Sequence, residues 1–270
     1  MNKILLIGCG HMGFALLSAW HKKTSNYFTV IDPKQFKILN RTYKKRVSAF
    51  YSIDKISSVK NFDIIVFAIK PQIADQVMQH FVNLKYKKNV LFISIVAGKK
   101  ISFFKNFLPI KNQFVRVMPN MPAFVNEGIS CLVSNKLISK QNKNKVTILF
   151  NKVGKTLWLN HEKELDKVTA ISGSGPGYYF LFIDLLEKVA VELGFNKKIA
   201  KQLVYQTALG SIQLLMNNSK SAEQLTRNIA VRGGTTEAAI KLFKKNNRLK
   251  KIINQAVNAA HMRSVELGKK

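Results

Sequence analysis

The first residues whose types and spacing could do chemistry form a glycine-rich loop near the N-terminus. Gly8, Gly10 and Gly13 make a G-x-G-x-x-G pattern that directly follows a short apolar run, residues 3–7. In that position the first glycine permits a tight turn, the second lets the backbone approach a pyrophosphate, and the third allows close helix packing. The helix that follows would offer free N–H groups to the phosphates. We therefore expect a dinucleotide to contact Gly8, Gly10, His11, Met12 and Gly13.

An acidic residue stands where such a cofactor would place its adenosine ribose. Asp32 ends the next apolar run and lies 19 residues after Gly13. A carboxylate there fits a ribose 2′-hydroxyl, which favours NADH. Lys34 and Lys37 follow closely and could instead neutralise a 2′-phosphate, which favours NADPH. The sequence leaves both cofactors open.

Two further apolar runs end in small or positively charged residues. Ala68-Ile69-Lys70-Pro71 closes one run, and Val96-Ala97-Gly98 closes another. Ligands of open α/β sheets bind beyond the carboxyl ends of the strands, so both turns should line the same crevice. Small residues there would leave room for a nicotinamide. The cofactor contacts that we expect at these turns are Ala68, Ile69, Lys70, Pro71, Val96 and Ala97.

A second glycine-rich segment opens a helix far along the chain. Gly233 and Gly234 precede Thr235 and Thr236, so free helix N–H groups and two hydroxyls could cradle an anion. Ordinary helix capping by threonine after a Gly-Gly loop explains the pattern equally well. A carboxylate bound here would suit a small anionic substrate beside a nicotinamide.

The sequence shows no arrangement typical of other catalytic chemistries. Its two cysteines, Cys9 and Cys131, are far apart and lack metal-ligand spacing. Neither a Ser-His-Asp arrangement nor a pair of catalytic carboxylates is evident. A hydride-transfer enzyme does not need one, because the cofactor carries the chemistry. Unpaired cysteines suit a reducing compartment, and we expect a cytoplasmic protein without a signal peptide or membrane-spanning run.

The chain is strongly basic, with 44 Lys and Arg residues against 14 Asp and Glu residues and a formal net charge of +30. Such an excess can indicate an acidic partner such as nucleic acid. The basic residues are scattered along the chain rather than gathered in one helix or arm. We therefore favour compositional drift over a nucleic-acid partner.

The elements that would position these residues change in kind at about residue 160. Before it, short apolar runs alternate with segments of helical period, which predicts a mostly parallel sheet with helices on both faces. After it, helices are predicted over 161–171, 176–194, 196–217, 220–229, 235–245 and 248–267. The fold class that we expect is α/β: a Rossmann-like dinucleotide-binding domain over 1–160 and an all-α helical dimerisation domain over 161–270.

A glycine-rich stretch separates the first two of these helices. Residues 172–177 contain three glycines and a proline, so we expect an interruption that admits close backbone approach. The helix 176–194 that follows is apolar on more than one face, which is typical of burial on several sides. In a small helical domain this favours a partner subunit, although a central helix in a monomeric bundle would show the same pattern. Gly194 should cap its C-terminus.

Taken together, these segments resemble pyrroline-5-carboxylate reductase, the last enzyme of proline synthesis. The similarity covers nearly the whole chain in the family's order. The matching motifs are Gly8–Gly13, Phe67–Gln72, Ile93–Gly98, Arg116–Ala123, Ala170–Pro176 and Gly233–Thr236. The last two of these motifs are specific to the family, whereas the first is shared by many dehydrogenases.

The resemblance implies hydride transfer from NADPH or NADH to the C=N bond of L-1-pyrroline-5-carboxylate, giving L-proline. The C-terminal helices would form a homodimer, and larger rings of dimers occur in the family. Thr236 would be the catalytic residue near the ring nitrogen, and Asn228 would add a cofactor contact. The substrate would contact Glu162, Ser174, Gly175, Gly233, Gly234, Thr235 and Thr236.

One departure and two alternatives accompany the resemblance. Where the family usually has Thr-Ser-Pro before the two glycines, this chain has Ala230, Val231 and Arg232. Two hydroxyls are therefore missing, while the backbone N–H groups remain. The nearest alternative is a related imine or β-hydroxyacid reductase of the same design, but no catalytic lysine follows the Ser174 loop. A non-catalytic dinucleotide-binding protein that binds nucleic acid through its basic surface is an alternative from another class.

Overall fold

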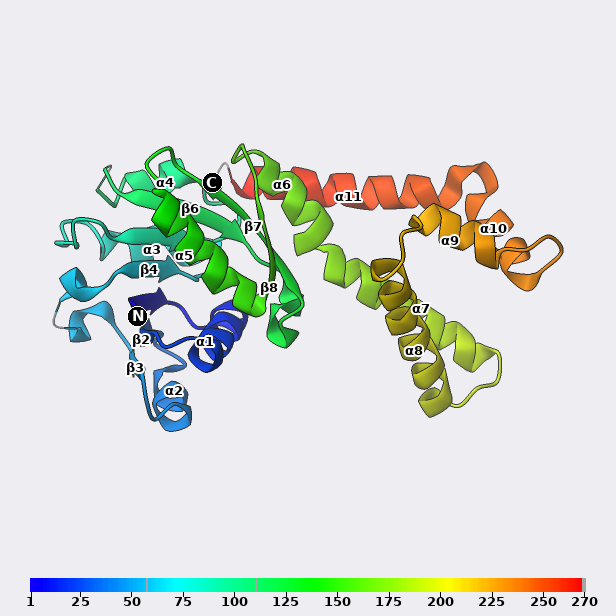
Figure 1. Ribbon diagram of the computed structural model, residues 1–270, viewed down its shortest axis with the longest axis horizontal. Coiled ribbons are helices and arrows are strands. Elements are labelled where there is room, and N and C mark those ends of the chain that lie inside the picture. Colours follow the sequence, from blue (N-terminus) through cyan, green and yellow to red (C-terminus); the bar gives the residue numbers. More distant parts are fainter. Residues whose placement is uncertain (57, 110, 269–270) are drawn as a thin grey trace. The chain divides into compact units, whose positions relative to one another are not determined.

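The computed structural model divides into two compact units (Figure 1). The sheet unit comprises Met1–Ser174 together with the C-terminal segment that starts at Ala260, and the helical unit comprises Gly175–Ala259. No helix in the described part of the chain is both long and apolar enough to cross a membrane. The residues that the structure describes are 1–56, 58–109 and 111–268.

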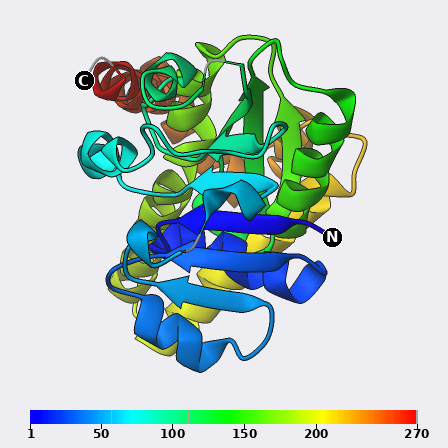
Figure 2. The same cartoon turned by 90° about the vertical axis from the view of Figure 1, so that its left-hand side faces the viewer.

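The sheet unit is built on one eight-stranded sheet of order β3-β2-β1-β4-β5-β6-β7-β8. Neighbouring strands from β3 to β6 are parallel, β7 is antiparallel to β6, and β8 is parallel to β7. Figure 2 shows the strands side by side, with colours passing from blue to green across the sheet. The predicted α/β class is confirmed. The strands are β1 Lys3–Ile7, β2 Tyr27–Ile31, β3 Val47–Phe50, β4 Ile64–Phe67, β5 Leu91–Ser94, β6 Gln113–Met118, β7 Gly128–Ser134 and β8 Gly154–Trp158.

The two faces of the sheet bury alternate residues under different helices. In β1, Ile4 and Leu6 belong to one core, and Leu5 and Ile7 belong to the other. This period of two is what a strand covered on both faces requires. The first core includes residues of α1, α2 and α5, and the second includes residues of α3 and α4. The helices are α1 His11–Lys23, α2 Phe36–Thr42, α3 Ala74–Gln79, α4 Ile101–Lys105 and α5 Lys140–Phe150.

Aromatic side chains fill the second core. The ring centroid of Phe67 lies 5.1 Å from that of Phe81, 5.6 Å from that of Phe104 and 6.3 Å from that of Phe92. Stacked and edge-to-face pairs at such separations add about 0.5–1.5 kcal/mol each to the stabilisation from burial. Because β4 ends at Phe67, this cluster fixes where the following turn leaves the sheet.

The helix that leaves the sheet unit is less interrupted than the sequence predicts. α6 continues through one π-helical turn and, after Ser174, into α7. The Ser174 N–H donates to the Thr169 carbonyl oxygen at 2.8 Å, one residue further back than in an α-helix. The expected break is therefore a single widened turn. These segments are α6 Glu164–Val168, the π-turn Thr169–Gly173 and α7 Gly175–Glu192.

The sequence and the tertiary contacts divide the chain at places one helix apart. Periodicity suggests a domain boundary at residue 160, whereas the compact units meet after Ser174. α6 accounts for the difference, because its Leu165 is fully buried against Cys131 and Val133 of β7. In the sequence, α6 belongs to the run of helices that follows residue 160, but in the structure it packs on the sheet.

The helical unit begins with α7 and α8, which pack on one another after a chain reversal at Gly194. Gly194 adopts φ +98°, and its N–H donates to the Val191 carbonyl oxygen at 2.9 Å. The Phe195 N–H donates to the Ala190 carbonyl oxygen at 3.2 Å. This pair of bonds is a Schellman motif, so the predicted glycine cap is confirmed. The remaining helices are α8 Lys197–Met216, α9 Ala222–Ile229, α10 Thr235–Lys244 and α11 Arg248–Leu267.

Apolar side chains of α7 are exposed in the single chain. Tyr179, Phe180, Leu181 and Phe182 are each at least half exposed. Four consecutive residues span slightly more than one helical turn, so the exposed apolar surface surrounds the helix instead of forming one stripe. A surface of this kind marks an interface with another chain.

The last turns of α11 pack on the sheet unit. The Ser264 hydroxyl donates to Asp166 Oδ1 at 2.8 Å, and both residues are buried. The turn after β5 approaches the same end of the helix. Gly98 there has φ +76°, and a Cβ added to it would lie 3.0 Å from the Leu267 carbonyl carbon. The turn after β5 therefore rests directly on the backbone of α11.

We predict that Ser264→Ala lowers the free energy of unfolding by about 1–3 kcal/mol, because the buried Asp166 carboxylate loses a hydrogen-bond donor. Urea unfolding followed by circular dichroism at a fixed protein concentration measures the change. The matched control is Ser219→Ala, at an exposed position, which should change the free energy by less than about 0.5 kcal/mol. Equal stability of the two variants would contradict the prediction.

Candidate functional site

The carboxyl ends of four neighbouring parallel strands bring predicted cofactor residues to one edge of the sheet. Ile7 of β1 pairs in register with Ile31 of β2 and with Phe67 of β4, and Phe67 pairs with Ser94 of β5. Each of these residues is the last of its strand. The segments that follow therefore meet at the edge where ligands of parallel sheets bind. They are Gly8–Gly13, Asp32, Ala68–Pro71 and residues 95–98.

The glycine loop packs against the turn after β4 with no side chain between them. Gly8 adopts φ +89°, and a Cβ there would lie 2.6 Å from the Ala68 carbonyl oxygen. A Cβ on Gly13 would lie 2.5 Å from the Gly8 carbonyl oxygen, so α1 starts in contact with the loop. A Cβ on Gly10, by contrast, would meet no atom within 4 Å. The open backbone at Gly10 fits the pyrophosphate of a dinucleotide.

The other predicted residues at this edge differ in exposure. His11 and Lys70 are exposed, and Val96 is buried. The remaining predicted residues of the sheet unit are half-buried, so part of their surface is open to a ligand. These residues are Met12, Ala68, Ile69, Pro71, Ala97, Glu162 and Ser174.

Asp32 ends β2 with its carboxylate turned into the protein. Its Oδ2 accepts from the Cys9 N–H at 2.7 Å, and its Oδ1 accepts from the N–H groups of Lys34 and Gln35 at 2.8 Å each. The residue is 9% exposed. The carboxylate therefore holds the glycine loop and the turn after β2 together. A contact from Asp32 to a ribose stays a prediction.

The cysteine of the glycine loop is buried. Burial, followed by the nearby Asp32 carboxylate, raises the pKa of Cys9 to about 12. Burial also raises the pKa of the Cys131 thiol. A thiol with a raised pKa stays protonated near neutral pH, so Cys9 has a packing role. Among the described residues, no group of three His, Cys, Asp or Glu side chains is placed to hold a metal ion.

A buried lysine links two of the turns at the sheet edge. The Lys99 ammonium pairs with Asp75 at 2.9 Å and lies 4.1 Å from the Phe103 ring centroid. Asp75 stands in the first turn of α3, just after Ala68–Pro71, whereas Lys99 directly follows Gly98. The ion pair therefore links the segment after β4 to the segment after β5. Sequence reasoning missed Lys99 because no local pattern distinguishes one buried lysine from the many exposed ones.

Glu162, a predicted substrate contact, joins three segments of the sheet unit. Its Oε1 accepts from the Ile101 N–H at 2.8 Å and from Arg116 Nη1 at 3.1 Å. The Arg116 side chain is 4% exposed, so loss of Glu162 would leave a buried charge without its counter-ion. One oxygen of Glu162 thus braces α4 and β6. Its contact to a substrate nitrogen stays a prediction.

Asn120 connects the end of β6 to the π-helical turn. Its Nδ2 donates to the Ser172 carbonyl oxygen at 3.1 Å, and its Oδ1 accepts a backbone N–H from β7 at 2.8 Å. Beside it, a Cβ on Gly173 would lie 2.9 Å from Met118 Cε. The π-helical turn therefore lies against the Met118 side chain at the end of β6. The motif that contains Asn120 and Arg116 marks this segment in the sequence, but it does not reveal these contacts.

The second predicted constellation begins α10 in the helical unit. The Gly233 N–H donates to Glu237 Oε2 at 2.8 Å, and the Gly234 N–H donates to a carbonyl oxygen three residues back. Within the described residues, no group accepts from the N–H of Thr235 or Thr236. Because Gly233 and Gly234 use their N–H groups inside the turn, the N–H groups left for an anion are those of the first residues of α10, Thr235, Thr236 and Glu237.

A carboxylate and backbone hydrogen bonds hold the turn before α10. The bond from Gly233 and, next, the Lys241 ammonium lower the pKa of Glu237, which stays charged and holds the turn. The remaining bonds of the turn come from the backbone. The side chains of Ala230 and Val231 take no part in these bonds.

The remaining predicted residues of the helical unit are Asn228 and Gly175. Asn228 is exposed in α9, and its amide lies beside the Gln224 carbonyl oxygen and Lys220 Nζ. A Cβ on Gly175 would meet no atom within 4 Å. The predicted site residues thus form one group in the sheet unit and a second group in the helical unit.

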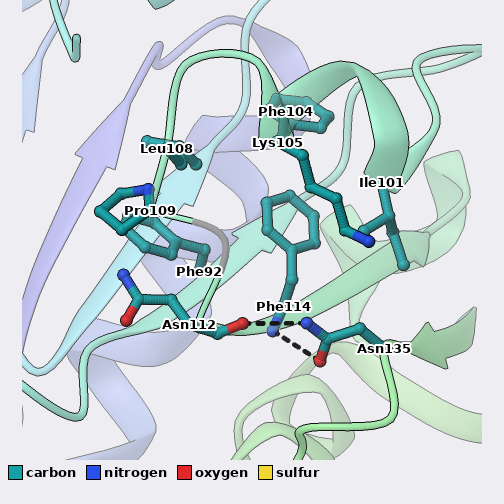
Figure 3. Close-up of a pocket in the computed structure, with 9 residues that line it drawn as sticks. All are labelled: Phe92, Ile101, Phe104, Lys105, Leu108, Pro109, Asn112, Phe114 and Asn135. Carbon is teal, nitrogen blue, oxygen red and sulfur yellow. Dashed lines mark hydrogen bonds between the residues drawn. The ribbon is translucent and has the colours of Figure 1, made fainter.

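Two hollows in the sheet unit lie away from this edge. One is a cavity of about 10 Å³ between α4 and β6. Figure 3 shows its lining, where Asn135 accepts from the Phe114 N–H and donates to the Asn112 carbonyl oxygen. That volume holds about one water molecule at most. A groove of about 600 Å³ lies over the amino-terminal parts of β1 and β2, beside Lys3 and Tyr27. Neither is a candidate for the cofactor.

Family models match both halves of the chain. The model described as pyrroline-5-carboxylate reductase dimerisation matches residues 162–267. The model described as NADP oxidoreductase coenzyme F420-dependent matches residues 3–98, the part that contains the glycine loop.

Relatives match over nearly the full length. Pyrroline-5-carboxylate reductase of Pseudomonas aeruginosa is 32% identical over 98% of this chain and 96% of its own. The pyrroline-5-carboxylate reductase of Pasteurella multocida is 33% identical over 99% of this chain and 98% of its own. Among solved structures, pyrroline carboxylate reductase of Plasmodium falciparum with NADP bound is 31% identical with a TM-score of 0.84, covering 99% of this chain and 98% of that one. A pyrroline-5-carboxylate reductase from Coxiella burnetii is 29% identical with a TM-score of 0.88, covering 100% and 99%.

We predict that alanine at Gly10 weakens cofactor binding, whereas alanine at Gly13 lowers thermal stability. Gly10→Ala should leave the melting temperature unchanged, because its Cβ meets no atom, but weaken dinucleotide binding roughly 10-fold or more by blocking the pyrophosphate. Gly13→Ala should lower the melting temperature, because its Cβ would clash with the Gly8 carbonyl oxygen. Thermal unfolding and calorimetric titration with NADP⁺ measure both. Unchanged NADP⁺ affinity in Gly10→Ala would refute the assignment of this loop.

Proposed function

The chain belongs to the pyrroline-5-carboxylate reductase family, and we propose that it reduces L-1-pyrroline-5-carboxylate to L-proline with NADPH or NADH. The family is one of NAD(P)H-dependent oxidoreductases. One observation in this structure supports the proposal most strongly. The backbone at Gly10 is open, and next to it Gly8 is in close contact with Ala68. It lies where parallel sheets bind dinucleotides, and the family match supplies the substrate.

The residues at the sheet edge would hold the cofactor. The backbone of the glycine loop and the N-terminus of α1 would bind the pyrophosphate, with His11 and Met12 beside it. When bound, the reduced nicotinamide supplies the hydride for the carbon of the C=N bond. Asn228 would add a contact from α9. The two turns that would flank the nicotinamide contribute Ala68, Ile69, Lys70, Pro71, Val96 and Ala97.

The start of α10 would bind the substrate carboxylate. Thr235 and Thr236 have N–H groups without an acceptor among the described residues, and the helix dipole favours an anion there. The neighbouring glycines keep side chains away from this turn. The wider substrate surface would include Gly233, Gly234, Glu162, Ser174 and Gly175.

Thr236 is the residue that we assign to the substrate nitrogen. Its hydroxyl would orient the nitrogen or relay a proton to it. A protonated imine is more electrophilic, and solvent can protonate it, so a strong acid in the protein is unnecessary. Most of the remaining acceleration would come from positioning. The ion pairs of Lys99 with Asp75 and of Arg116 with Glu162 would supply that rigidity at the sheet edge.

Self-association through the C-terminal helices is supported by the dimerisation model over residues 162–267 and by the exposed apolar surface of α7. We propose a homodimer as the basic unit and a ring of dimers as its larger assembly. We also propose that the protein works in the cytoplasm, because its buried, unpaired Cys9 and Cys131 suit a reducing compartment.

The direct test is to follow NADPH and NADH oxidation with L-1-pyrroline-5-carboxylate as substrate. We expect turnover with at least one cofactor and stoichiometric formation of L-proline. The absence of turnover with both cofactors, in protein that binds NADP⁺, would overturn the proposed substrate.

Replacement of the Thr236 hydroxyl tests its role. Thr236→Ala should lower kcat/KM for the imine by roughly 10–100-fold, whereas Thr236→Ser, which keeps the hydroxyl, should stay within a few-fold of the wild type. Thr42→Ala, at an exposed helical threonine of α2, is the matched control and should be unchanged. An unchanged kcat/KM in Thr236→Ala would remove the threonine from the mechanism.

A further inference from the structure

Only one oxygen of the Glu162 carboxylate is bound inside the protein. Its Oε1 accepts from the Ile101 N–H at 2.8 Å and from Arg116 Nη1 at 3.1 Å. No hydrogen bond reaches Oε2 from the described parts of the chain, residues 1–56, 58–109 and 111–268. The Glu162 side chain is 27% exposed, whereas the Arg116 side chain is 4% exposed. The carboxylate therefore has an unused acceptor, and part of its surface is open to a ligand.

This carboxylate lies at the same edge of the sheet as the predicted cofactor turns. Arg116 of β6 pairs in register with Ser94, the last residue of β5. Ile101 begins α4, three residues after Gly98. Because both groups bind Glu162 Oε1, the carboxylate sits between β6 and the segment that follows β5. Ligands of parallel sheets bind at this edge.

The backbone that carries Glu162 is held as well. The Glu162 carbonyl oxygen accepts from the Leu165 N–H at 3.0 Å, and Leu165 is fully buried against β7. The Glu164 carboxylate accepts from the His161 N–H at 2.8 Å and closes the same turn. With the backbone fixed and two donors on Oε1, the direction of Oε2 is fixed too.

The unused oxygen suits a positively charged N–H group. The protonated form of an imine carries one N–H and a positive charge, and a carboxylate oxygen makes a short, strong hydrogen bond to such a donor. Without Arg116, the Ile101 N–H would be the only donor on the carboxylate, and the side chain could turn towards water. The buried arginine therefore determines whether Oε2 stays in place.

Resting on the proposed function, we propose that Arg116 is a positioning residue that acts through Glu162. Arg116 and the Ile101 N–H hold Oε1, and Glu162 thereby presents Oε2 to the protonated nitrogen of the substrate. Arg116 itself touches neither the substrate nor the cofactor. Its effect is geometric, because an iminium that is held by its N–H keeps its C=N carbon in one place beside the segment after β5.

This contact and the one assigned to Thr236 serve different states of the nitrogen. Before reduction, the protonated nitrogen has an N–H but no lone pair, so it binds the acceptor Oε2 of Glu162. When the carbon gains a hydride, the two π electrons of the C=N bond become a lone pair on the nitrogen. That lone pair can accept from the Thr236 hydroxyl or take a proton through it.

Paired substitutions test whether Arg116 acts through Glu162. Arg116→Met should lower kcat/KM for L-1-pyrroline-5-carboxylate roughly 10-fold or more and leave KM for NADPH within about 2-fold. Arg116→Lys, which keeps the charge and a donor, should stay within about 3-fold of the wild type.

Glu162→Gln removes the outer acceptor alone. Both inner partners are donors, so the glutamine oxygen stays inside and its NH₂ group, which cannot accept, takes the place of Oε2. We expect kcat/KM to fall about as far as in Arg116→Met. In the double variant, Arg116→Met should add less than about 2-fold to the loss from Glu162→Gln.

Stability is measured beside the kinetics, because loss of one charge from a buried pair destabilises a protein. The double variant leaves no unpaired buried charge, and its comparison with Glu162→Gln does not need the Arg116→Met single variant. The matched control is Arg46→Met, at a half-buried arginine just before β3 that donates to the His21 carbonyl oxygen at 2.8 Å. It should lower the melting temperature but keep kcat/KM within about 2-fold.

Two kinetic results would overturn the proposal. In the first, the full loss from Arg116→Met persists in the Glu162→Gln background, so the arginine acts by another route. In the second, KM for NADPH rises as much as kcat/KM for the imine falls, so the pair is only a structural brace for the segment after β5.

Binding of the product separates this inference from the proposed function. Calorimetric titration in the presence of NADP⁺ compares L-proline with cyclopentanecarboxylate, which has a carbon in place of the ring nitrogen. We expect the wild type to bind L-proline roughly 10-fold or more tightly, and Arg116→Met and Glu162→Gln to reduce that ratio to within about 3-fold. A ratio that the variants leave unchanged would overturn the role of Arg116, even in an active enzyme. A ratio that falls as expected in a protein without reductase activity would retain that role and reject the substrate.

Discussion

Parallel strand pairing is the constraint on which the rest of the structure depends. Because parallel neighbours cannot be joined by tight hairpins, each connection returns over a face of the sheet, and the carboxyl ends of β1, β2, β4 and β5 meet at one edge. The turns at that edge lie beyond the sheet's hydrogen bonds. They must be held by other contacts, and these contacts determine whether a cofactor finds a rigid surface.

Two kinds of contact hold this edge. The first is close backbone packing, in which Gly8 lies against Ala68 and Gly13 lies against Gly8 with no side chain between them. The second is the buried polar brace, in which Asp32 and Glu162 accept backbone N–H groups from neighbouring turns. Asp32 and Glu162 are two of the 14 acidic residues of the chain, which has 44 Lys and Arg residues.

The last helix connects this edge to the self-associating part of the protein. α11 begins in the helical unit, and its final turns bond to Asp166 through Ser264 and lie against Gly98. The turn after β5 is therefore in contact with the last residue of α11, and both belong to the sheet unit.

The sequence by itself determined the elements and their order. Alternating apolar runs, the glycine loop and the helical periods after residue 160 predict the strands, the α/β class and the Gly194 cap, because each depends on neighbouring residues alone. Tertiary structure decided the partners of Asp32, Glu162 and Lys99, the continuation of the helix through residues 169–173, and the return of the C-terminal segment to the sheet. These features depend on which groups meet across tens of residues of chain, and a residue's type does not say whether its charge faces a ligand or a buried backbone N–H.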